Sequence, residues 1–184
     1  VVQQSLASEL VRLYDGLISE STYAYRPGRA ALQAIGYLDK EISSGAYGWV
    51  LKADIRSFFD HIMLEKLYQI LRERIRENDV IELIRRCCEA PSLEKDGSLT
   101  VKTLGVYQGS GIAPVLSNVY LMKFDHEIRE RCQVYVRYSD DILILGKSQE
   151  ELEKVKNFMA LYLEKLGLQL HENKTRIQSL EESI

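Results

Sequence analysis

The stretch that decides the fold places two adjacent acids between two apolar runs: Val134-Tyr135-Val136-Arg137-Tyr138-Ser139-Asp140-Asp141-Ile142-Leu143-Ile144-Leu145. β-Branched and aromatic residues are typical of strands, so we predict strands over 134–138 and 142–145. Asp is a common turn former, and a polar hairpin turn is the simplest interpretation of Asp140 and Asp141 taken alone. Adjacent carboxylates, however, repel each other and are costly to bury without a counter-charge.

A second apolar run, over 49–55, carries another acid near its end, Asp54. We predict a buried strand here as well. If the two acid-bearing strands are neighbours in one sheet, Asp54, Asp140 and Asp141 can meet. Hard oxygen ligands of this kind hold Mg²⁺, which binds through a few carboxylates plus substrate phosphates. Two such ions, about 3.5–4 Å apart, form the clamp for in-line phosphoryl transfer, and this is the chemistry that the three acids indicate.

The rest of the chain combines helices with short, adjacent strands. The helical spacing of apolar residues predicts helices over 3–19, about 30–43, 61–90, 114–131 and 149–166. Asp96-Gly97 fits a hairpin turn between short strands at about 91–95 and 99–104, and we expect a last strand pair over 168–180. This order favours an α+β fold over a parallel doubly wound sheet.

Length and composition limit the class of protein. The chain has 184 residues, of which 46% are hydrophobic and 28% charged, so it is one globular domain or a large piece of one. The net charge of −3 argues mildly against nucleic-acid binding, which must then be argued from a site. No apolar run approaches the ~18 residues of a membrane span, so we expect no membrane partner. Because the start lacks Met and a signal-peptide pattern, we interpret the chain as cut from a longer one.

The three cysteines bear on metal binding and on location. They form no CxxC pair and lie in no Cys/His cluster. This argues against a zinc site and a disulfide scaffold, and it favours a reducing compartment, so we expect a cytoplasmic protein.

Taken together with further segments, the acids resemble the palm motifs of reverse transcriptases, arranged in the family's order along nearly the whole chain. The segments are 21–29 for the fingers–palm junction of group II intron enzymes, 54–60 for the first palm motif, 105–121 for the second, 138–141 for the third, and 166–168 with 173–175 for the fourth. Ser139 stands where bacterial intron-type enzymes commonly have Ala.

The resemblance implies the domain organisation. It implies an α+β polymerase palm, an antiparallel sheet with helices packed on one face, together with part of the fingers. We expect partial fingers and the fingers–palm junction over 1–50, and the palm over 51–184 with a helical insertion around 61–104. The family's basic fingers segment and helical thumb are expected to be absent from this chain, which accounts for its near-neutral charge.

The resemblance also implies the catalytic and metal-binding residues. Asp54, Asp140 and Asp141 are implied to be catalytic metal ligands for two Mg²⁺ ions, with Mn²⁺ as an alternative. The carbonyl of Ile55 is implied to add a ligand. Lys174 matches a lysine near the leaving pyrophosphate, where it acts as a cation or proton donor, although a solvated strand-end lysine is an equal alternative.

Four residues are implied to bind the nucleotide: Lys174, through the pyrophosphate, and Phe59, Gln108 and Gly109. Phe59 matches the family's steric gate against a ribose 2′-OH, and the alternative is a core ring beside Phe58. Gln108 and Gly109 match residues that line the nucleotide pocket, and the alternative for Gly109 is an ordinary flexible loop. Gly111 stands where the intron-type pattern has Pro, which is expected to loosen this pocket.

Two arginines are implied to bind nucleic acid. Arg26 and Arg29 are candidates for contacts with template phosphates, and either could equally be a structural arginine that holds its loop.

The favoured function is RNA-directed DNA polymerisation, with an RNA template, a DNA or RNA primer and deoxynucleoside triphosphates. One alternative is a nucleic-acid-binding module on the same fold without polymerase activity. Another, an RNA polymerase or nucleotidyl cyclase on a related palm, is disfavoured by the bulk of Phe59. Intron RNA and CRISPR-type proteins are candidate partners, and whether the fragment is active alone is left open.

Overall fold

The computed structural model describes residues 2–93, 99–100, 104–107 and 109–181. The chain divides into two compact units, the first formed by Val1–Gly16 with Ser57–Tyr120 and the second by Leu17–Arg56 with Leu121–Ile184. The boundary between the units falls within helix α6, Ala113–Arg129. Among the described residues, no helix is long and apolar enough to cross a membrane.

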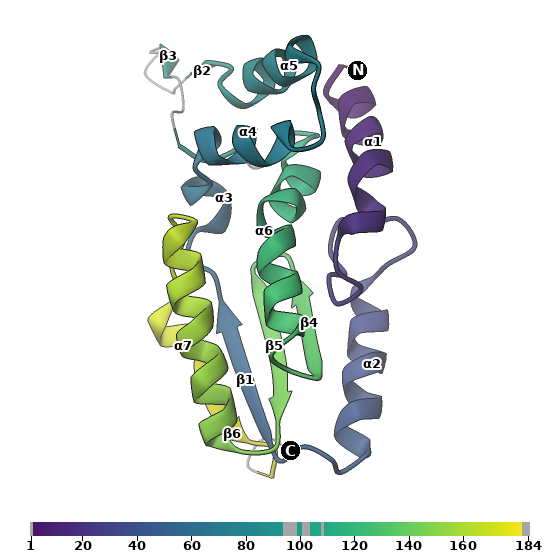
Figure 1. Cartoon of the computed structure of the whole chain (residues 1–184), viewed down its shortest axis with the longest axis vertical. Coiled ribbons are helices and arrows are strands. Elements are labelled where there is room, and N and C mark those ends of the chain that lie inside the picture. The colour runs from purple at the N-terminus through teal and green to yellow at the C-terminus, as the bar shows by residue number, and fades with distance from the viewer. Residues whose placement is uncertain (1, 94–98, 101–103, 108, 182–184) are drawn as a thin grey trace. The chain divides into compact units, whose positions relative to one another are not determined.

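The second unit is built on an antiparallel four-stranded sheet in the order β4-β5-β1-β6 (Figure 1). Its strands are β1 (Trp49–Asp54), β4 (Val134–Tyr138), β5 (Asp141–Gly146) and β6 (Arg176–Ser179). The predictions for β1, β4 and β5 are confirmed to within a residue at each end. β5 and β1 are the two inner strands, and the apolar residues of β5 are buried toward both faces of the sheet.

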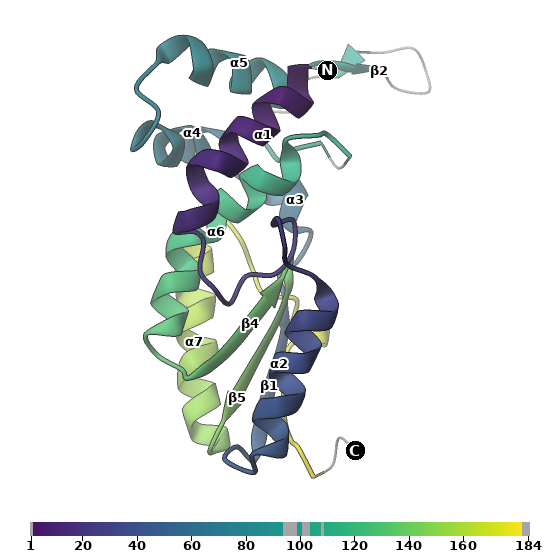
Figure 2. The same ribbon diagram turned by 90° about the vertical axis from the view of Figure 1, so that its right-hand side faces the viewer.

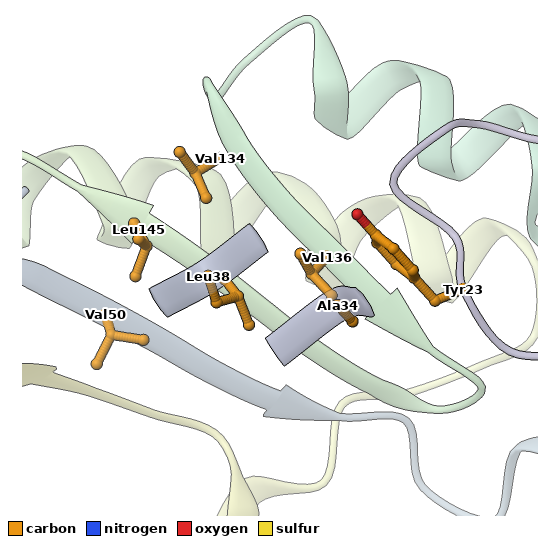
Figure 3. Close-up of a cluster of buried hydrophobic side chains, with 7 residues drawn as sticks. All are labelled: Tyr23, Ala34, Leu38, Val50, Val134, Val136 and Leu145. Atoms are coloured by element: carbon orange, nitrogen blue, oxygen red, sulfur yellow. The ribbon is translucent and has the colours of Figure 1, made fainter. Parts of the chain in front are cut away.

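Helices cover both faces of this sheet, whereas the family resemblance implied helices on one face. α7 (Gln149–Lys165) packs on β1, β5 and β6, and α2 (Ala31–Ser43) lies against β4 from the opposite side (Figure 2). The physical reason is a second apolar surface on the α2 side. Its buried residues are Tyr23, Ala34, Leu38, Val50, Val134, Val136 and Leu145 (Figure 3).

Helix α7 begins and ends as its sequence predicts. The hydroxyl of Ser148 accepts a hydrogen bond from the Glu151 N–H at 3.2 Å, as an N-cap does. The Glu151 carboxylate accepts a hydrogen bond from the Lys147 N–H at 2.8 Å, one residue before the N-cap N–H that it would bind in a capping box. Gly167, at φ +74°, ends the helix in the left-handed conformation that favours glycine.

The predicted strand pair over 168–180 is wrong in part. Leu170 forms only an isolated bridge with Ile55, and a 3₁₀ turn, η2 (Glu172–Lys174), separates it from β6. The turn forms because the N–H groups of Lys174 and Thr175 both donate to the carbonyl of His171, which ends the extended run.

The first unit is mainly helical. Its helices are α1 (Val2–Tyr14), α3 (Phe58–His61), α4 (Leu64–Arg72), α5 (Asn78–Cys88) and the first part of α6. The helix predicted over 61–90 is two helices, α4 and α5. The helical spacing of its buried apolar residues is interrupted between Ile75 and Ile81, so each helix buries its own apolar face. Short strands β2 (Ser92–Leu93) and β3 (Leu99–Thr100) form the predicted hairpin, whose turn lies outside the described residues. The 3₁₀ turn η1 (Asp15–Leu17) follows α1 and leads into the second unit.

Candidate active site

The sheet of the second unit brings the three predicted acids to one end. Asp54 is the last residue of β1 and Asp141 the first of β5, and the strand register sets them directly opposite each other. Asp140 lies in the turn between β4 and β5, and its carbonyl accepts a hydrogen bond from the Ile55 N–H at 3.1 Å. Residues 54–55 and 140–141 are therefore joined through the backbone, as expected for acids on neighbouring strands.

The negative charges in this cluster repel one another. Asp54 is buried, with 7% of its surface exposed, whereas Asp141 is exposed to solvent. Partial desolvation of the Asp141 carboxyl raises its pKa, and the negative charges of Asp140 and Asp54 raise it further. Lys52 and Lys174 oppose this rise without cancelling it. A cluster whose members repel each other is stabilised by positive charge at the same place.

Lys174 supplies one such charge. Its Nζ lies 3.0 Å from Asp54 Oδ2, and this hydrogen bond, followed by the charges of the acids, raises the pKa of Lys174. The backbone holds the same segment in place, because the His171 N–H donates to the Asp54 carbonyl at 2.7 Å. The turn η2 thus puts Lys174 beside the acids, although its side chain remains 58% exposed.

The donor chemistry of the acids fits Mg²⁺, which prefers carboxylate oxygens. No group of three or more His, Cys, Asp or Glu side chains in the described part of the chain is gathered as a ready metal site. Asp54 Oδ2 is instead paired with Lys174. The three carboxylates are therefore of the type that binds Mg²⁺, and they share one end of the sheet.

Of the predicted nucleotide-binding residues, Phe59 and Gly109 lie in the first unit, whereas Lys174 lies in the second. Phe59 is half-buried in α3, and its ring centroid is 5.3 Å from that of Phe58. Phe58 is the more buried of the two rings, with 2% of its surface exposed, so Phe58 rather than Phe59 is the main core ring of this helix. Gly109 is exposed, at φ +89°, with open space where a side chain would begin. Gln108 lies outside the described residues.

Backbone contacts tie the loop of Gly109 to the Phe59 segment. The Val106 N–H donates to the Phe59 carbonyl at 2.8 Å, and the Gly105 N–H donates to the Ile62 carbonyl at 2.8 Å. Gly105 has φ +81°, and a Cβ there would lie 2.7 Å from the backbone oxygen of Asp60. Glycine is therefore required where the loop leaves this segment.

Gln3 is a contact of this loop that the sequence did not indicate. Its Oε1 accepts hydrogen bonds from the Ser110 hydroxyl at 3.3 Å and from the Gly111 N–H at 3.2 Å. The Gly111 N–H is the group that a proline at this position would lack. In this chain, α1 thus holds the loop at the residue where the family pattern has Pro.

Arg26 and Arg29 both bind their own loop. Arg26 is buried, and its Nη1 donates to the carbonyls of Ser19 and Thr22 at 2.7 and 3.1 Å. Arg29 pairs with the carboxylate of Glu20 and lies 5.3 Å from the centroid of the Tyr23 ring. These contacts support the structural alternative for both residues, and contact with template phosphates stays a prediction.

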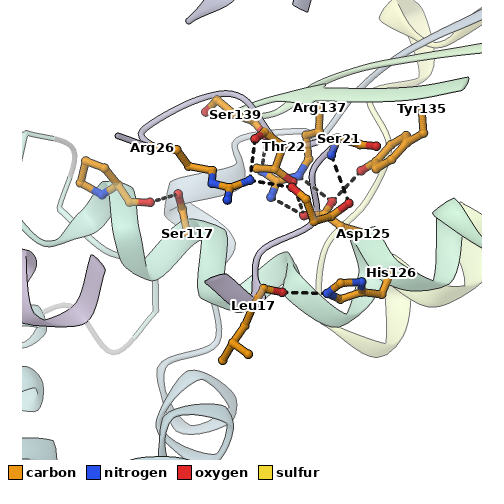
Figure 4. Close-up of polar contacts among 12 residues, drawn as sticks. Leu17, Ser21, Thr22, Arg26, Ser117, Asp125, His126, Tyr135, Arg137 and Ser139 are labelled. Carbon is orange, nitrogen blue, oxygen red and sulfur yellow. Dashed lines mark hydrogen bonds and ion pairs between the residues drawn. The ribbon is translucent and has the colours of Figure 1, made fainter. Parts of the chain in front are cut away.

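A buried polar network next to the acids was also missed. Arg137 and Asp125 form an ion pair at 2.6 Å with both side chains 0% exposed, and Tyr135 and Thr22 also donate to Asp125 (Figure 4). A signal was present in the sequence: alternation along 134–138 puts Arg137 on a buried face of its strand. A buried arginine requires an anionic partner, but the pattern alone does not identify Asp125.

Comparison with known proteins agrees with this fold. The family model described as "Reverse transcriptase (RNA-dependent DNA polymerase)" matches residues 1–183. A telomerase structure from Candida albicans in complex with a fragment of telomeric RNA superposes with a TM-score of 0.72 at 15% identity, covering 97% of this chain and 35% of that one. The fold is therefore an α+β palm with part of the fingers.

The similar curated proteins include intron-encoded and retron proteins. An uncharacterised 91 kDa protein in the cob intron of Schizosaccharomyces pombe is 31% identical over 70% of this chain and 16% of its own length. The group II intron-encoded protein LtrA of Lactococcus lactis is 26% identical over 71% of this chain and 23% of its own length. The retron Mx65 reverse transcriptase of Myxococcus xanthus is 24% identical over 88% and 39%.

The chain spans well under two thirds of each of these relatives. It is similar to group II intron proteins, and the family match extends over nearly every residue, from 1 to 183. This chain belongs to the reverse transcriptase family.

Proposed function

We propose that the whole protein is an RNA-directed DNA polymerase that extends a primer 3′-OH on an RNA template with deoxynucleoside triphosphates. The observation that carries the proposal is the end of the sheet at which Asp54 faces Asp141, with Asp140 in the adjoining turn. Three carboxylates on adjacent backbone segments, with a raised pKa at Asp141, form the kind of site that divalent cations stabilise, and such cations also bind substrate phosphates.

Asp54, Asp140 and Asp141 would hold two Mg²⁺ ions, with the Ile55 carbonyl as a further ligand. When bound, Mg²⁺ supplies charge stabilisation to the attacking and leaving oxygens of the phosphoryl transfer. Lys174 would give charge or a proton to the departing pyrophosphate, and its contact with Asp54 supports this role.

The nucleotide side of the proposal rests on the first unit. Gly109 permits the backbone to approach a nucleotide closely, and Gln108 would line the same pocket. Phe59, less buried than Phe58, would exclude a ribose 2′-OH by its bulk. Similarity to group II intron proteins adds intron RNA as a candidate partner.

The proposal is tested by primer extension with the whole protein. An RNA template annealed to a DNA primer is supplied with Mg²⁺ and either deoxynucleotides or ribonucleotides. We expect deoxynucleotide incorporation that stops when EDTA is added. Binding of the template–primer without any extension would contradict the proposal and favour the non-polymerising, nucleic-acid-binding alternative.

A further inference from the structure

Arg137 lies next to the acids, and each of its three guanidinium nitrogens donates a hydrogen bond within the second unit. Its Nε and Nη2 donate to the two carboxylate oxygens of Asp125 at 2.7 and 2.6 Å. Its Nη1 donates to the carbonyl of Ser139 at 2.9 Å (Figure 4). The guanidinium therefore connects the buried carboxylate of α6 to the residue that immediately precedes Asp140.

The carbonyl that Arg137 holds belongs to a strained turn. Ser139 has φ +61°, a left-handed conformation that is unfavourable for residues other than glycine and asparagine. Such a conformation persists only when its surroundings fix it. The Arg137 contact is one such constraint, and another is the hydrogen bond from the Tyr25 hydroxyl to the Ser139 hydroxyl at 3.3 Å.

Asp125 is in turn held by several donors. Besides Arg137, the Tyr135 hydroxyl donates at 2.6 Å and the Thr22 hydroxyl at 2.9 Å, so the carboxylate is buried with each oxygen bonded. The backbone adds to this, because the Arg137 N–H donates to the Ser21 carbonyl at 2.8 Å. The arginine side chain is thus fixed from the fingers–palm junction segment and from α6.

Stability alone does not require an ion pair here, because buried ion pairs can often be replaced by apolar residues of similar volume without loss of stability. An apolar pair, however, cannot hold the Ser139 carbonyl. Lysine cannot either while it also serves both oxygens of Asp125, because it lacks the planar fork of arginine.

We propose that Arg137 is a positioning residue: through the Ser139 carbonyl, it fixes the turn that carries Asp140 and Asp141 in the conformation that binds divalent cations. The inference rests on the proposed function for its catalytic meaning. Its structural basis is the continuous path from Asp125 through Arg137 to Ser139.

The test compares three variants of the whole protein. Arg137→Lys keeps the buried positive charge but loses the planar guanidinium that donates to Asp125 and Ser139 together. Asp125→Leu with Arg137→Met replaces the ion pair by an apolar pair. Tyr135→Phe is the matched control, because it removes one donor to Asp125 and leaves the contact between Arg137 and Ser139 intact. Each is measured for Mn²⁺ affinity by electron paramagnetic resonance, for melting temperature, and for primer extension.

We expect Arg137→Lys and the apolar pair to bind Mn²⁺ about 10-fold more weakly, the size of effect typical of groups that orient metal ligands. Tyr135→Phe is expected to keep the wild-type affinity. An apolar pair that melts like the wild type and binds Mn²⁺ equally well would overturn the inference. Failure of both Arg137 variants to fold, where Tyr135→Phe folds, would also overturn it, since the pair would then serve the fold.

The same experiment separates this inference from the proposed function. A wild-type protein that binds Mn²⁺ but extends no primer would contradict the polymerase assignment, while the Mn²⁺ affinities of the variants would still decide the role of Arg137. A wild-type protein that binds no Mn²⁺ would overturn the inference directly.

Discussion

Asp54 and Asp141 lie opposite each other across the β1–β5 pair, and the negative charge of Asp54 contributes to the raised pKa of Asp141. The acids at this end of the sheet thus destabilise one another. The sign follows from linkage: an acid with a raised pKa in the folded state disfavours folding once the pH exceeds its ordinary pKa.

Asp141→Asn is therefore expected to raise the melting temperature of the metal-free protein at about pH 7, where the wild-type carboxyl is charged. The difference should shrink toward about pH 3, where Asp is protonated in both folded and unfolded chains. Mg²⁺ should stabilise the wild type more than the variant. Thermal melts with EDTA and with Mg²⁺ check this, and Asp39→Asn, an exposed acid of α2, is the control. A lower melting temperature for Asp141→Asn would contradict the charge-repulsion account.

Phe59→Val is expected to raise ribonucleotide use relative to deoxynucleotide use, because a smaller side chain leaves room for the 2′-OH. Relief of steric overlap of about 1–3 kcal/mol corresponds to roughly 5- to 150-fold in the ratio of kcat/KM values. Phe58→Ala is the matched control: as a core ring, it should cost about 3–5 kcal/mol of stability and depress both reactions alike. If Phe59→Val lost much stability but left the ratio of the two kcat/KM values unchanged, Phe59 would not be the residue that excludes the 2′-OH.

Gly105→Ala is expected to destabilise the protein by at least about 2 kcal/mol, because its Cβ would meet the Asp60 backbone and its φ is positive. Gly109→Ala shares the positive φ but has open space, so it should cost less stability. Denaturant melts of both variants give the comparison. Equal losses at the two positions would show that the close approach at Gly105 is not what demands glycine.

Gln3→Ala is expected to raise the KM for deoxynucleotides up to about 5-fold, the equivalent of one hydrogen bond of about 1 kcal/mol. Gly111→Pro should stiffen the loop, and it removes the N–H that donates a hydrogen bond to Gln3. The two changes should therefore be non-additive: Gln3→Ala should have a smaller effect in the Gly111→Pro background. Additive effects on KM would mean that Gln3 does not act through Gly111.

The central sheet and its acids could be predicted from the sequence because local patterns determine both. Apolar runs define β1, β4 and β5, and acids at strand ends are visible in the chain. The partner of Arg137 could not be predicted, because it depends on which face of α6 meets β4. The cover that α2 gives to the second face of the sheet and the contact of Gln3 with Gly111 likewise depend on tertiary packing.

The predicted roles of Arg26 and Lys174 illustrate the same limit. The sequence does not distinguish a functional from a structural role for either residue, since a charged residue near a turn has no distinctive pattern. The structure turns the Arg26 side chain toward carbonyls of its own loop and sets Lys174 against Asp54. The course of the backbone in each loop determines which groups each side chain contacts, and the sequence pattern does not give that course.

The most direct test of the central claim is the single-turnover rate of primer extension by Asp54→Asn and Asp140→Asn in the whole protein, on an RNA template with Mg²⁺. Asp39→Asn serves as the control for removing one carboxylate charge from the same unit. We predict that both active-site variants lose several orders of magnitude in rate and keep their fold by melting temperature, because each lacks a charge that the metals need. Extension at the wild-type rate by either variant would contradict the assignment of these acids as the catalytic metal ligands.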